Sequence, residues 1–308
     1  MKKWFLVILM IGFLVTACSA QLAFVEDAAT GTLIVREGQT DVLTYRYGDQ
    51  LKLGIDPKYT QSCYIHPLFS LDGQALTDDS PDDHLHHHGL FWTWPVVRTR
   101  GLSTSTWEPK VPRLRQHFVR WLKREVEGRG ALLSIENSWL LDDKEIVAKE
   151  VVTLHLHPAD NLGRAIDLEL KIEALGGDLE LQGTLDQNKG YGGLCFRGAP
   201  ILTGATMTTD QGALKDDAVH TPFLWADLST RELGIAIFVS PDHPGFPTRW
   251  MIRNSYAGVI NVSWPGLTSV VLKPGEPAIL RYRIYVHSRD AAAGEAKAAY
   301  FAYTKGRS

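Results

Sequence analysis

The chain has 308 residues, of which 22% are charged and 44% are hydrophobic, as in an ordinary globular protein. Its formal net charge is −3. Without Lys2 and Lys3, which lie in a segment that we expect to be removed, 30 basic residues face 35 acidic ones, a net charge of −5. Nucleic-acid binding needs clustered Lys and Arg to neutralise phosphates. The acidic balance and the lack of a basic run therefore argue against nucleic acid as a partner.

The N-terminal segment has the pattern of a bacterial lipoprotein signal. Lys2 and Lys3 precede an apolar run over residues 4–15, which is too short for a membrane span of about 20 residues. Leu14-Val15-Thr16-Ala17-Cys18 then matches a lipobox, in which cleavage before the cysteine leaves it as the lipidated N-terminus. The alternative is an ordinary secretory signal cut near Ala20. We favour residues 1–17 as a lipoprotein signal peptide.

This signal predicts where the protein is found. Residues 18–308 would be the mature protein, a single domain held to the membrane only by the lipid on Cys18. Ser19 follows the cysteine, and the absence of Asp at this position favours sorting to the outer membrane. We therefore expect a protein of the bacterial cell envelope, on the periplasmic face of the outer membrane.

Two further cysteines, Cys63 and Cys195, each lie in an apolar, strand-like stretch. Neither has a nearby second cysteine, which argues against a cysteine zinc site. An oxidising periplasm would allow them to pair. Their separate apolar contexts favour two buried free thiols instead.

Short segments with a period of two dominate the rest of the chain, so alternate side chains share one face. No linker or repeat interrupts the pattern. The sequence therefore predicts an all-β fold, a large antiparallel β-sandwich with one wet face. The Ala-rich stretch 290–302 predicts a short C-terminal helix capped by Ser288 or Asp290. The expected strands include residues 22–25, 32–35, 42–47, 117–121, 131–139, 146–157, 165–174, 179–183, 234–239, 249–253, 258–264, 269–272 and 278–287.

Histidines are concentrated in the irregular stretch 54–113. His66 precedes a group of four histidines, His84 and His86–His88, which follows Asp83. Neutral imidazoles are common ligands of divalent metals, so His66, His84, His86 and His87 are candidate ligands. Imidazoles also suit acid–base catalysis, with Asp83 orienting one ring. A third interpretation is an exposed loop with incidental histidines. In a strand, His84, His86 and His88 would share one face; in a loop, the rings could converge.

Other residues are candidates for secondary roles. His117 begins a strand and could face the same site, whereas the His155 and His157 pair is typical of surface packing. Arg197 ends the glycine-rich segment 189–197, which suggests a tight backbone beside a pocket. Arginines at such places either bind substrate or form salt bridges. The candidate substrate-binding residues are Arg197, Arg249, Trp92, Trp250 and His243.

The histidine motif resembles the signature of the bacterial family labelled "methane oxygenase PmoA". The matching residues are Tyr64-Ile65-His66-Pro67-Leu68 and Asp83-His84-Leu85-His86-His87-His88-Gly89-Leu90-Phe91. Leu85 stands where the family usually has proline, which leaves His84, His86 and His87 aligned and singles them out over His88. Weaker matches in the segments 42–45, 192–197, 242–250 and 280–287 extend the resemblance over nearly all of the mature chain.

The resemblance implies a sandwich similar to the galactose-mutarotase supersandwich and a role in carbohydrate metabolism. Its leading implication is an envelope enzyme acting on a sugar or keto-sugar by lyase, hydrolase or epimerase chemistry. His84, His86 and His87 would be acid–base groups, and His66 and His117 would be secondary. The alternatives are a non-catalytic sugar-binding lipoprotein and, as the label says, a metal-dependent oxygenase.

The lipobox predicts that the mature protein carries a lipid on Cys18. Growth with an alkyne-tagged palmitate analogue should label the wild-type protein, and Cys18→Ala should abolish the label because it removes the modified thiol. Cys63→Ala, which leaves the lipobox intact, is the control and should label normally. A Cys18→Ala protein that still carries the label would contradict lipidation at this position.

Overall fold

The computed structural model describes residues 21–255 and 258–305, so the signal segment and Cys18 lie outside the described residues. The described residues form 22 strands, three short 3-10 helices and one α-helix. The predicted all-β antiparallel sandwich with a short C-terminal helix is confirmed. No helix in these two ranges is long and apolar enough to cross a membrane.

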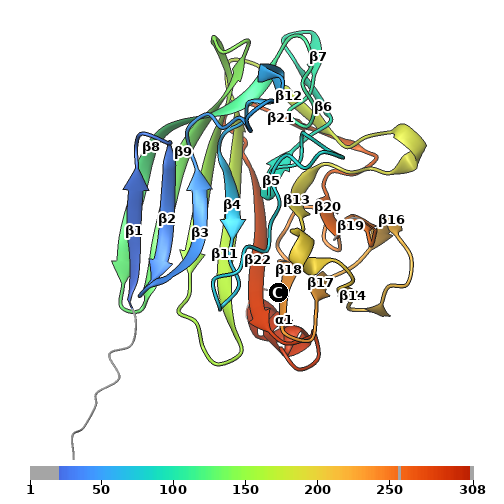
Figure 1. Cartoon of the computed structure of the whole chain (residues 1–308). Coiled ribbons are helices and arrows are strands. Elements are labelled where there is room, and N and C mark those ends of the chain that lie inside the picture. The colour runs from blue at the N-terminus through green and yellow to red at the C-terminus, as the bar shows by residue number, and fades with distance from the viewer. Residues whose placement is uncertain (1–20, 256–257, 306–308) are drawn as a thin grey trace, which may run out of the picture.

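Two nine-stranded sheets face each other, and a small four-stranded sheet caps one end (Figure 1). The front sheet runs β1 (Leu22–Asp27), β2 (Thr32–Glu37), β3 (Thr40–Arg46), β4 (Tyr64–Leu68), β5 (Leu90–Thr93), β13 (Gly193–Arg197), β20 (Val259–Ser263), β19 (Arg249–Arg253), β16 (Ala218–Pro222). The back sheet runs β15 (Gly212–Ala213), β14 (Thr206–Thr209), β17 (Trp225–Ser229), β18 (Leu233–Val239), β22 (Ala278–Ser288), β11 (Gly163–Ala174), β10 (Glu145–Leu156), β9 (Gly130–Leu141), β8 (Leu114–Glu127). The small sheet runs β21 (Ser269–Leu272), β12 (Leu179–Gln182), β6 (Val96–Thr99), β7 (Leu102–Thr104).

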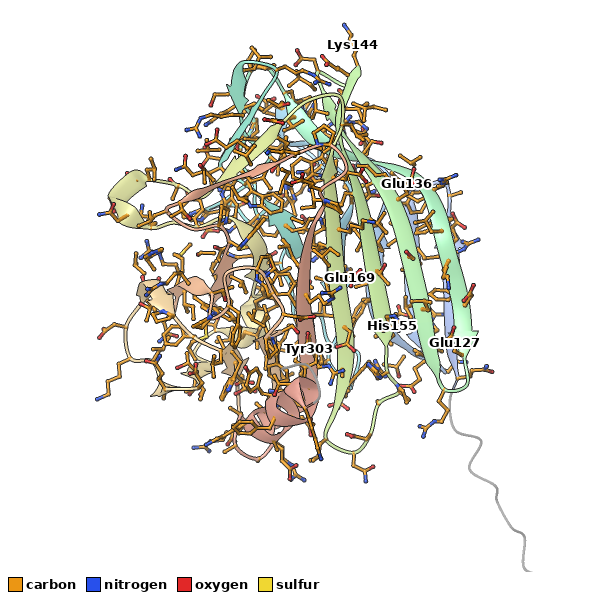
Figure 2. The ribbon with its side chains drawn as sticks, turned by 180° about the vertical axis from the view of Figure 1, so that it is seen from behind. Glu127, Glu136, Lys144, His155, Glu169 and Tyr303 are labelled. Carbon is orange, nitrogen blue, oxygen red and sulfur yellow. The ribbon has the colours of Figure 1, made fainter. Side chains whose placement is uncertain are left out.

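The core lies between the two large sheets, and strand periodicity creates it. In β11, Ile166, Leu168, Leu170 and Ile172 are buried at 1% exposure or less, while the intervening Asp, Glu and Lys side chains point outward. Burying each such side chain contributes about 1.5–3 kcal/mol. Figure 2 shows the outward face, with Glu136, His155 and Glu169 along the strands. The predicted wet face is therefore the rear of the back sheet.

The C-terminal helix starts later than predicted. Asp290 does cap a turn, since its Oδ1 accepts from the backbone N–H of Ala292 and Ala293 at 3.1 and 2.9 Å. That turn does not continue into the helix, because Glu295 adopts a left-handed conformation with φ of 57°. The helix α1 (Ala296–Thr304) begins only after it.

Both described cysteines are free and buried, which confirms two separate thiols. Burial raises the pKa of Cys63 and of Cys195, so neither is a reactive thiolate at neutral pH.

Gly89 joins the histidine loop to β5 at a place where no side chain fits. Its φ is +70°, and an added Cβ would lie 2.5 Å from the Ile65 carbonyl oxygen and 2.8 Å from His66 Cβ. The loop can return to the sheet this closely only because residue 89 lacks a side chain.

Gly89→Ala should therefore destabilise the protein by about 3 kcal/mol, from left-handed backbone strain of about 1–2 kcal/mol plus overpacking of about 1–3 kcal/mol. Gly128→Ala is the matched control, because Gly128 has φ of +61° but nothing within 4 Å of the added Cβ. Gly128→Ala should lower the free energy of unfolding only by the backbone strain of about 1–2 kcal/mol. Urea unfolding measures both; equal losses would show that the close approach at Gly89 costs nothing.

Candidate functional site

The four clustered histidines lie in a closed loop between β4 and β5. Backbone hydrogen bonds close its base, from Ser80 N–H to the His87 carbonyl at 2.7 Å and from Gly89 N–H to the Asp78 carbonyl at 2.8 Å. A turn within it is closed by the bond from His87 N–H to the His84 carbonyl at 3.0 Å. The histidines are therefore not on a strand, and the face shared by His84, His86 and His88 in a strand does not exist.

Three of the rings gather on one side of this loop. The His84 and His87 rings stack with centroids 4.6 Å apart, and His86 lies edge-on to both, at 5.7 Å from His84 and 4.8 Å from His87. Sequence reasoning singled out the same three imidazoles. We call them the histidine triplet.

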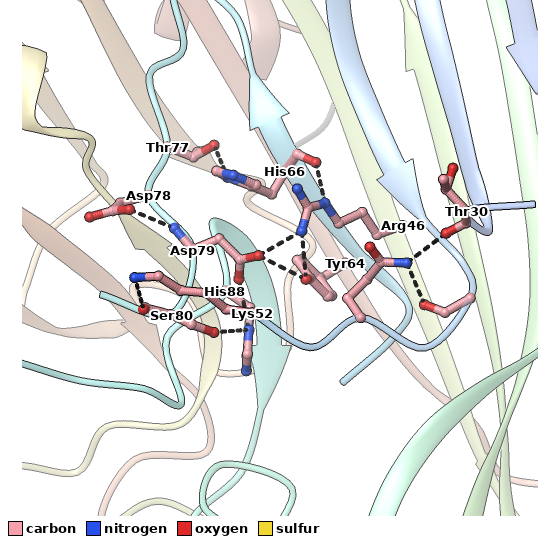
Figure 3. Close-up of polar contacts among 12 residues, drawn as sticks. Thr30, Arg46, Lys52, Tyr64, His66, Thr77, Asp78, Asp79, Ser80 and His88 are labelled. Carbon is pink, nitrogen blue, oxygen red and sulfur yellow. Dashed lines mark hydrogen bonds and ion pairs between the residues drawn. The ribbon is translucent and has the colours of Figure 1, made fainter. Parts of the chain in front are cut away.

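His88 lies in a polar network with Asp79, Arg46 and Tyr64 at the base of the loop (Figure 3). Its Nδ1 lies 2.9 Å from Asp79 Oδ1, and Asp79 Oδ2 accepts from Arg46 Nη1 at 2.7 Å and from the Tyr64 hydroxyl at 3.1 Å. Burial would raise the pKa of Asp79, but the hydrogen bond to His88 and the neighbouring positive charges lower it. This anchor network holds an ionised carboxylate at the base of the loop.

His66 lies beside the anchor network and is not part of the histidine triplet (Figure 3). Its Nδ1 lies 2.9 Å from the Thr77 hydroxyl (Figure 3), and burial lowers its pKa to about 4. The predicted secondary role of His66 therefore has no direct contact with the triplet to support it.

Asp83 links the triplet to the front sheet. Arg197 on β13 donates from Nη2 to both Asp83 oxygens at 2.8 and 2.9 Å, and Asp83 Oδ2 lies 2.9 Å from His84 Nδ1. Burial would raise the pKa of Asp83, but the bonds to His84 and Arg197 lower it. Asp83 thus orients His84 as expected. Arg197 forms the salt bridge that was the alternative to substrate binding, and its side chain is only 6% exposed.

His86 and His87 are held neutral. Burial, together with the neighbouring imidazoles, lowers the pKa of His86 to about 4 and that of His87 well below its usual value. His87 Nδ1 is buried without a hydrogen-bond partner among the described residues, and His86 Nε2 lies 3.9 Å from Glu108 Oε1. At neutral pH both imidazoles are therefore in the unprotonated form in which a histidine can act as a base.

The triplet borders a cleft of about 410 Å³, which we call the Tyr191 cleft. Two aromatic rings stand beside it, with the centroids of Trp107 and Tyr191 4.7 Å apart. Lys189 and Tyr191 confirm that the glycine-rich segment lies beside a pocket. The full lining is His84, His86, His87, Trp107, Glu108, Lys189, Tyr191, Asp217, Met251, Arg253, Ser255 and Val259.

Sequence reasoning missed several of these residues. Trp107 and Glu108 lie in the same irregular stretch 54–113 as the histidines, but nothing in the sequence marked them individually. Asp217 and Arg253 form an ion pair at 2.7 Å between segments 36 residues apart. Only the folded arrangement brings them to the cleft.

Three predicted substrate contacts are wrong, because their side chains are inside the core. Trp92 is 1% exposed and Trp250 is 0% exposed, with the Trp250 indole donating to the Phe223 carbonyl at 2.7 Å. His243 is 3% exposed and is bonded to the Tyr282 hydroxyl at 2.9 Å.

Two further candidates are accessible but do not border the Tyr191 cleft. His117 lies on β8 with Nε2 2.9 Å from Asp143 Oδ1. Arg249 is exposed at the start of β19. Neither is placed to act with the triplet in this conformation.

Within residues 21–255 and 258–305, no three or more His, Cys, Asp or Glu side chains are arranged to hold a metal ion. The His84 and His87 rings stack nearly parallel, at 15°, rather than pointing their nitrogens at one centre. His66 lies in a different network. The predicted ligands His66, His84, His86 and His87 therefore do not fit a divalent metal as arranged, and no chemical step is derived through one.

A family model matches residues 32–301, so the chain belongs to a family of unknown function, DUF6807. A search among curated proteins finds no match. Among solved structures, the chain is similar to a heparinase III, the BT4657 gene product with methylated lysines, at 10% identity and a TM-score of 0.43. The match covers 89% of this chain but only 36% of that one. A TM-score of this size does not establish a shared fold.

The neutral histidines make stability depend on pH. Because the folded pKa of His86 is about 4 against about 6.5 unfolded, the unfolded chain binds a proton between these values that the folded chain does not. Stability should therefore fall as pH falls from 6.5 towards 4. In His86→Gln the slope of unfolding free energy against pH should be smaller by up to about 1.4 kcal/mol per pH unit.

Urea unfolding at half-unit steps from pH 7.5 to 4.5 measures this slope. Phe301→Ala, at an exposed position on α1, is the control for changes unrelated to titration and should keep the wild-type slope. A His86→Gln protein with the wild-type slope would show that His86 is not held neutral by the fold.

Proposed function

We propose that the protein is a carbohydrate-active enzyme of the bacterial cell envelope that uses the histidine triplet for proton transfer. The observation that carries this proposal is the pairing of unlike imidazoles in one group. His84 is bonded to an ionised carboxylate, whereas His86 and His87 are buried and neutral. Environments that separate titratable groups in this way suit them to opposite acid and base roles.

The roles follow from the contacts. The Asp83 carboxylate, fixed by Arg197, contacts His84 Nδ1 and orients its ring, so we assign the proton-donor role to His84. His86 or His87, being neutral, is the proton acceptor. In a lyase the base removes the proton from the carbon next to a carbonyl and the acid protonates the leaving oxygen. In an epimerase the acid returns a proton to the same carbon, and in a hydrolase the base takes its proton from the attacking water, so all three reactions use such a pair.

The walls of the Tyr191 cleft support a sugar as substrate. The half-buried ring of Tyr191 offers an apolar face for the C–H face of a pyranose, and the buried Trp107 packs against it. Glu108, Asp217 and Lys189 offer acceptors and donors for its hydroxyls. A volume of about 410 Å³ lies within the range of small-molecule sites.

The same cleft would serve a non-catalytic sugar-binding lipoprotein, which predicts affinity without turnover. The resemblance to the PmoA-labelled family also keeps a metal-dependent oxygenase as an outcome of the test. Metal analysis of the purified protein separates that possibility, because iron or copper in stoichiometric amount would favour it.

At least one of His86→Ala and His87→Ala should lower turnover by about 100-fold or more, because one of these two imidazoles is the proposed proton acceptor. Assays would use a panel of glycosides and 3-keto-glycosides, with and without chelator, and circular dichroism would check folding. His155→Ala, which removes an exposed histidine on β10 outside the cleft, is the matched control and should retain wild-type activity. Wild-type activity in both triplet variants would rule out the proposed role.

A further inference from the structure

A second cleft meets the first across the histidine triplet. It has a volume of about 470 Å³ and is bordered on its outer side by Lys58, Tyr59, Asp82 and Pro109. We call it the Tyr59 cleft. His84, His86 and Glu108 border both clefts, so these three side chains form the wall where the two meet. The candidate acid–base groups thus stand in the middle of an extended groove and not at its end.

We propose that this groove binds a neutral oligosaccharide of two or more units, which crosses the wall of His84, His86 and Glu108 with its reacting bond over the imidazoles. This inference rests on the proposed carbohydrate function and adds the size and charge of the ligand. Each cleft alone falls within the range of about 300–1,000 Å³ for one small-molecule site. A single sugar would use only one of them, whereas a chain with a unit on each side of the reacting bond uses both.

The charges along the groove point to a neutral ligand. Lys58 Nζ lies 3.3 Å from Asp56, Lys189 Nζ lies 2.9 Å from Asp186, and the Arg253 guanidinium lies 2.7 Å from Asp217. In the described part of the chain, every Lys and Arg that borders either cleft is therefore already paired with a carboxylate. A sugar carboxylate would meet each cation with an acid beside it, and the resulting repulsion would offset the attraction.

Two tyrosines mark the two arms of the groove. Tyr191 stands beside Trp107 in the first cleft, and Tyr59, half-buried with Lys58 Nζ 5.2 Å from its ring centroid, stands in the second. Each tyrosine presents an apolar ring with a hydroxyl at its edge, which suits a pyranose. Removing one ring should therefore affect the sugar unit on its own side.

The experiment is calorimetric titration of the full mature protein with two series of ligands. One series comprises neutral gluco- and xylo-oligosaccharides of one to four units, and the other comprises oligogalacturonides of the same lengths. We expect the Kd to fall at least tenfold from one to three units in a neutral series, and the uronates to bind more weakly. Equal Kd values at all lengths, or tighter binding of the uronates, would overturn the proposal.

Variants separate the two arms. Tyr59→Ala should raise the Kd of the trisaccharide at least tenfold and leave that of the monosaccharide unchanged, while Tyr191→Ala should weaken both. Phe301→Ala, which removes an exposed ring on α1 outside the groove, should change neither. A Tyr59→Ala protein with wild-type trisaccharide affinity would contradict a ligand that reaches the second cleft.

The outcomes also separate this inference from the function on which it rests. Length-dependent binding of neutral sugars without turnover would support the groove and reject the enzyme. Turnover with equal affinity for one and three units would support the enzyme and overturn the groove. Absence of binding in both series would overturn both.

Discussion

Two carboxylate–arginine pairs fasten the histidine loop to the front sheet, and the geometry of the site depends on them. Asp79 is held by Arg46 of β3, and Asp83 is held by Arg197 of β13. The strands β4 and β5, which the loop connects, lie between these two strands in the sheet. The loop is thus attached on both sides of its own hairpin. Removing one partner leaves a charge uncompensated, and because both pairs are only partly buried this costs less than the roughly 3–5 kcal/mol of a fully buried pair. This cost favours a single position of the loop, so the irregular segment can hold its side chains in fixed places.

The sequence was most informative where one local rule decides the structure. Alternation of apolar and polar residues predicted the strands of the back sheet and its wet face, because period two leaves little choice of face. The glycine-rich segment predicted a close backbone beside a pocket, and the position of Asp83 beside the histidines predicted that it orients one of their rings. Each of these inferences concerns residues that are neighbours along the chain or across one turn.

The sequence was least informative where the direction of a side chain depends on partners that are distant along the chain. Trp92 and Trp250 lie on strands of the front sheet, and nothing local says whether an indole faces the core or the solvent; both face the core. Trp107 reaches the cleft through contacts with Tyr191, 84 positions later. Spacing alone also could not separate His88 from its neighbours. Its direction is set by Asp79 and Tyr64, which the fold places under the loop.

The four clustered histidines have different environments because only two of them lie within hydrogen-bond distance of a carboxylate. Asp83 bonds to His84 and Asp79 bonds to His88, so the outer members of the run each have an acid partner. His86 and His87, between them, have no carboxylate within hydrogen-bond distance in the described structure and are buried against aromatic rings. Burial without an acid partner is what makes an imidazole neutral. A run of chemically identical side chains is thereby separated into members that are hydrogen-bonded to a carboxylate and members that are not, which is the kind of difference that the proposed acid and base roles require.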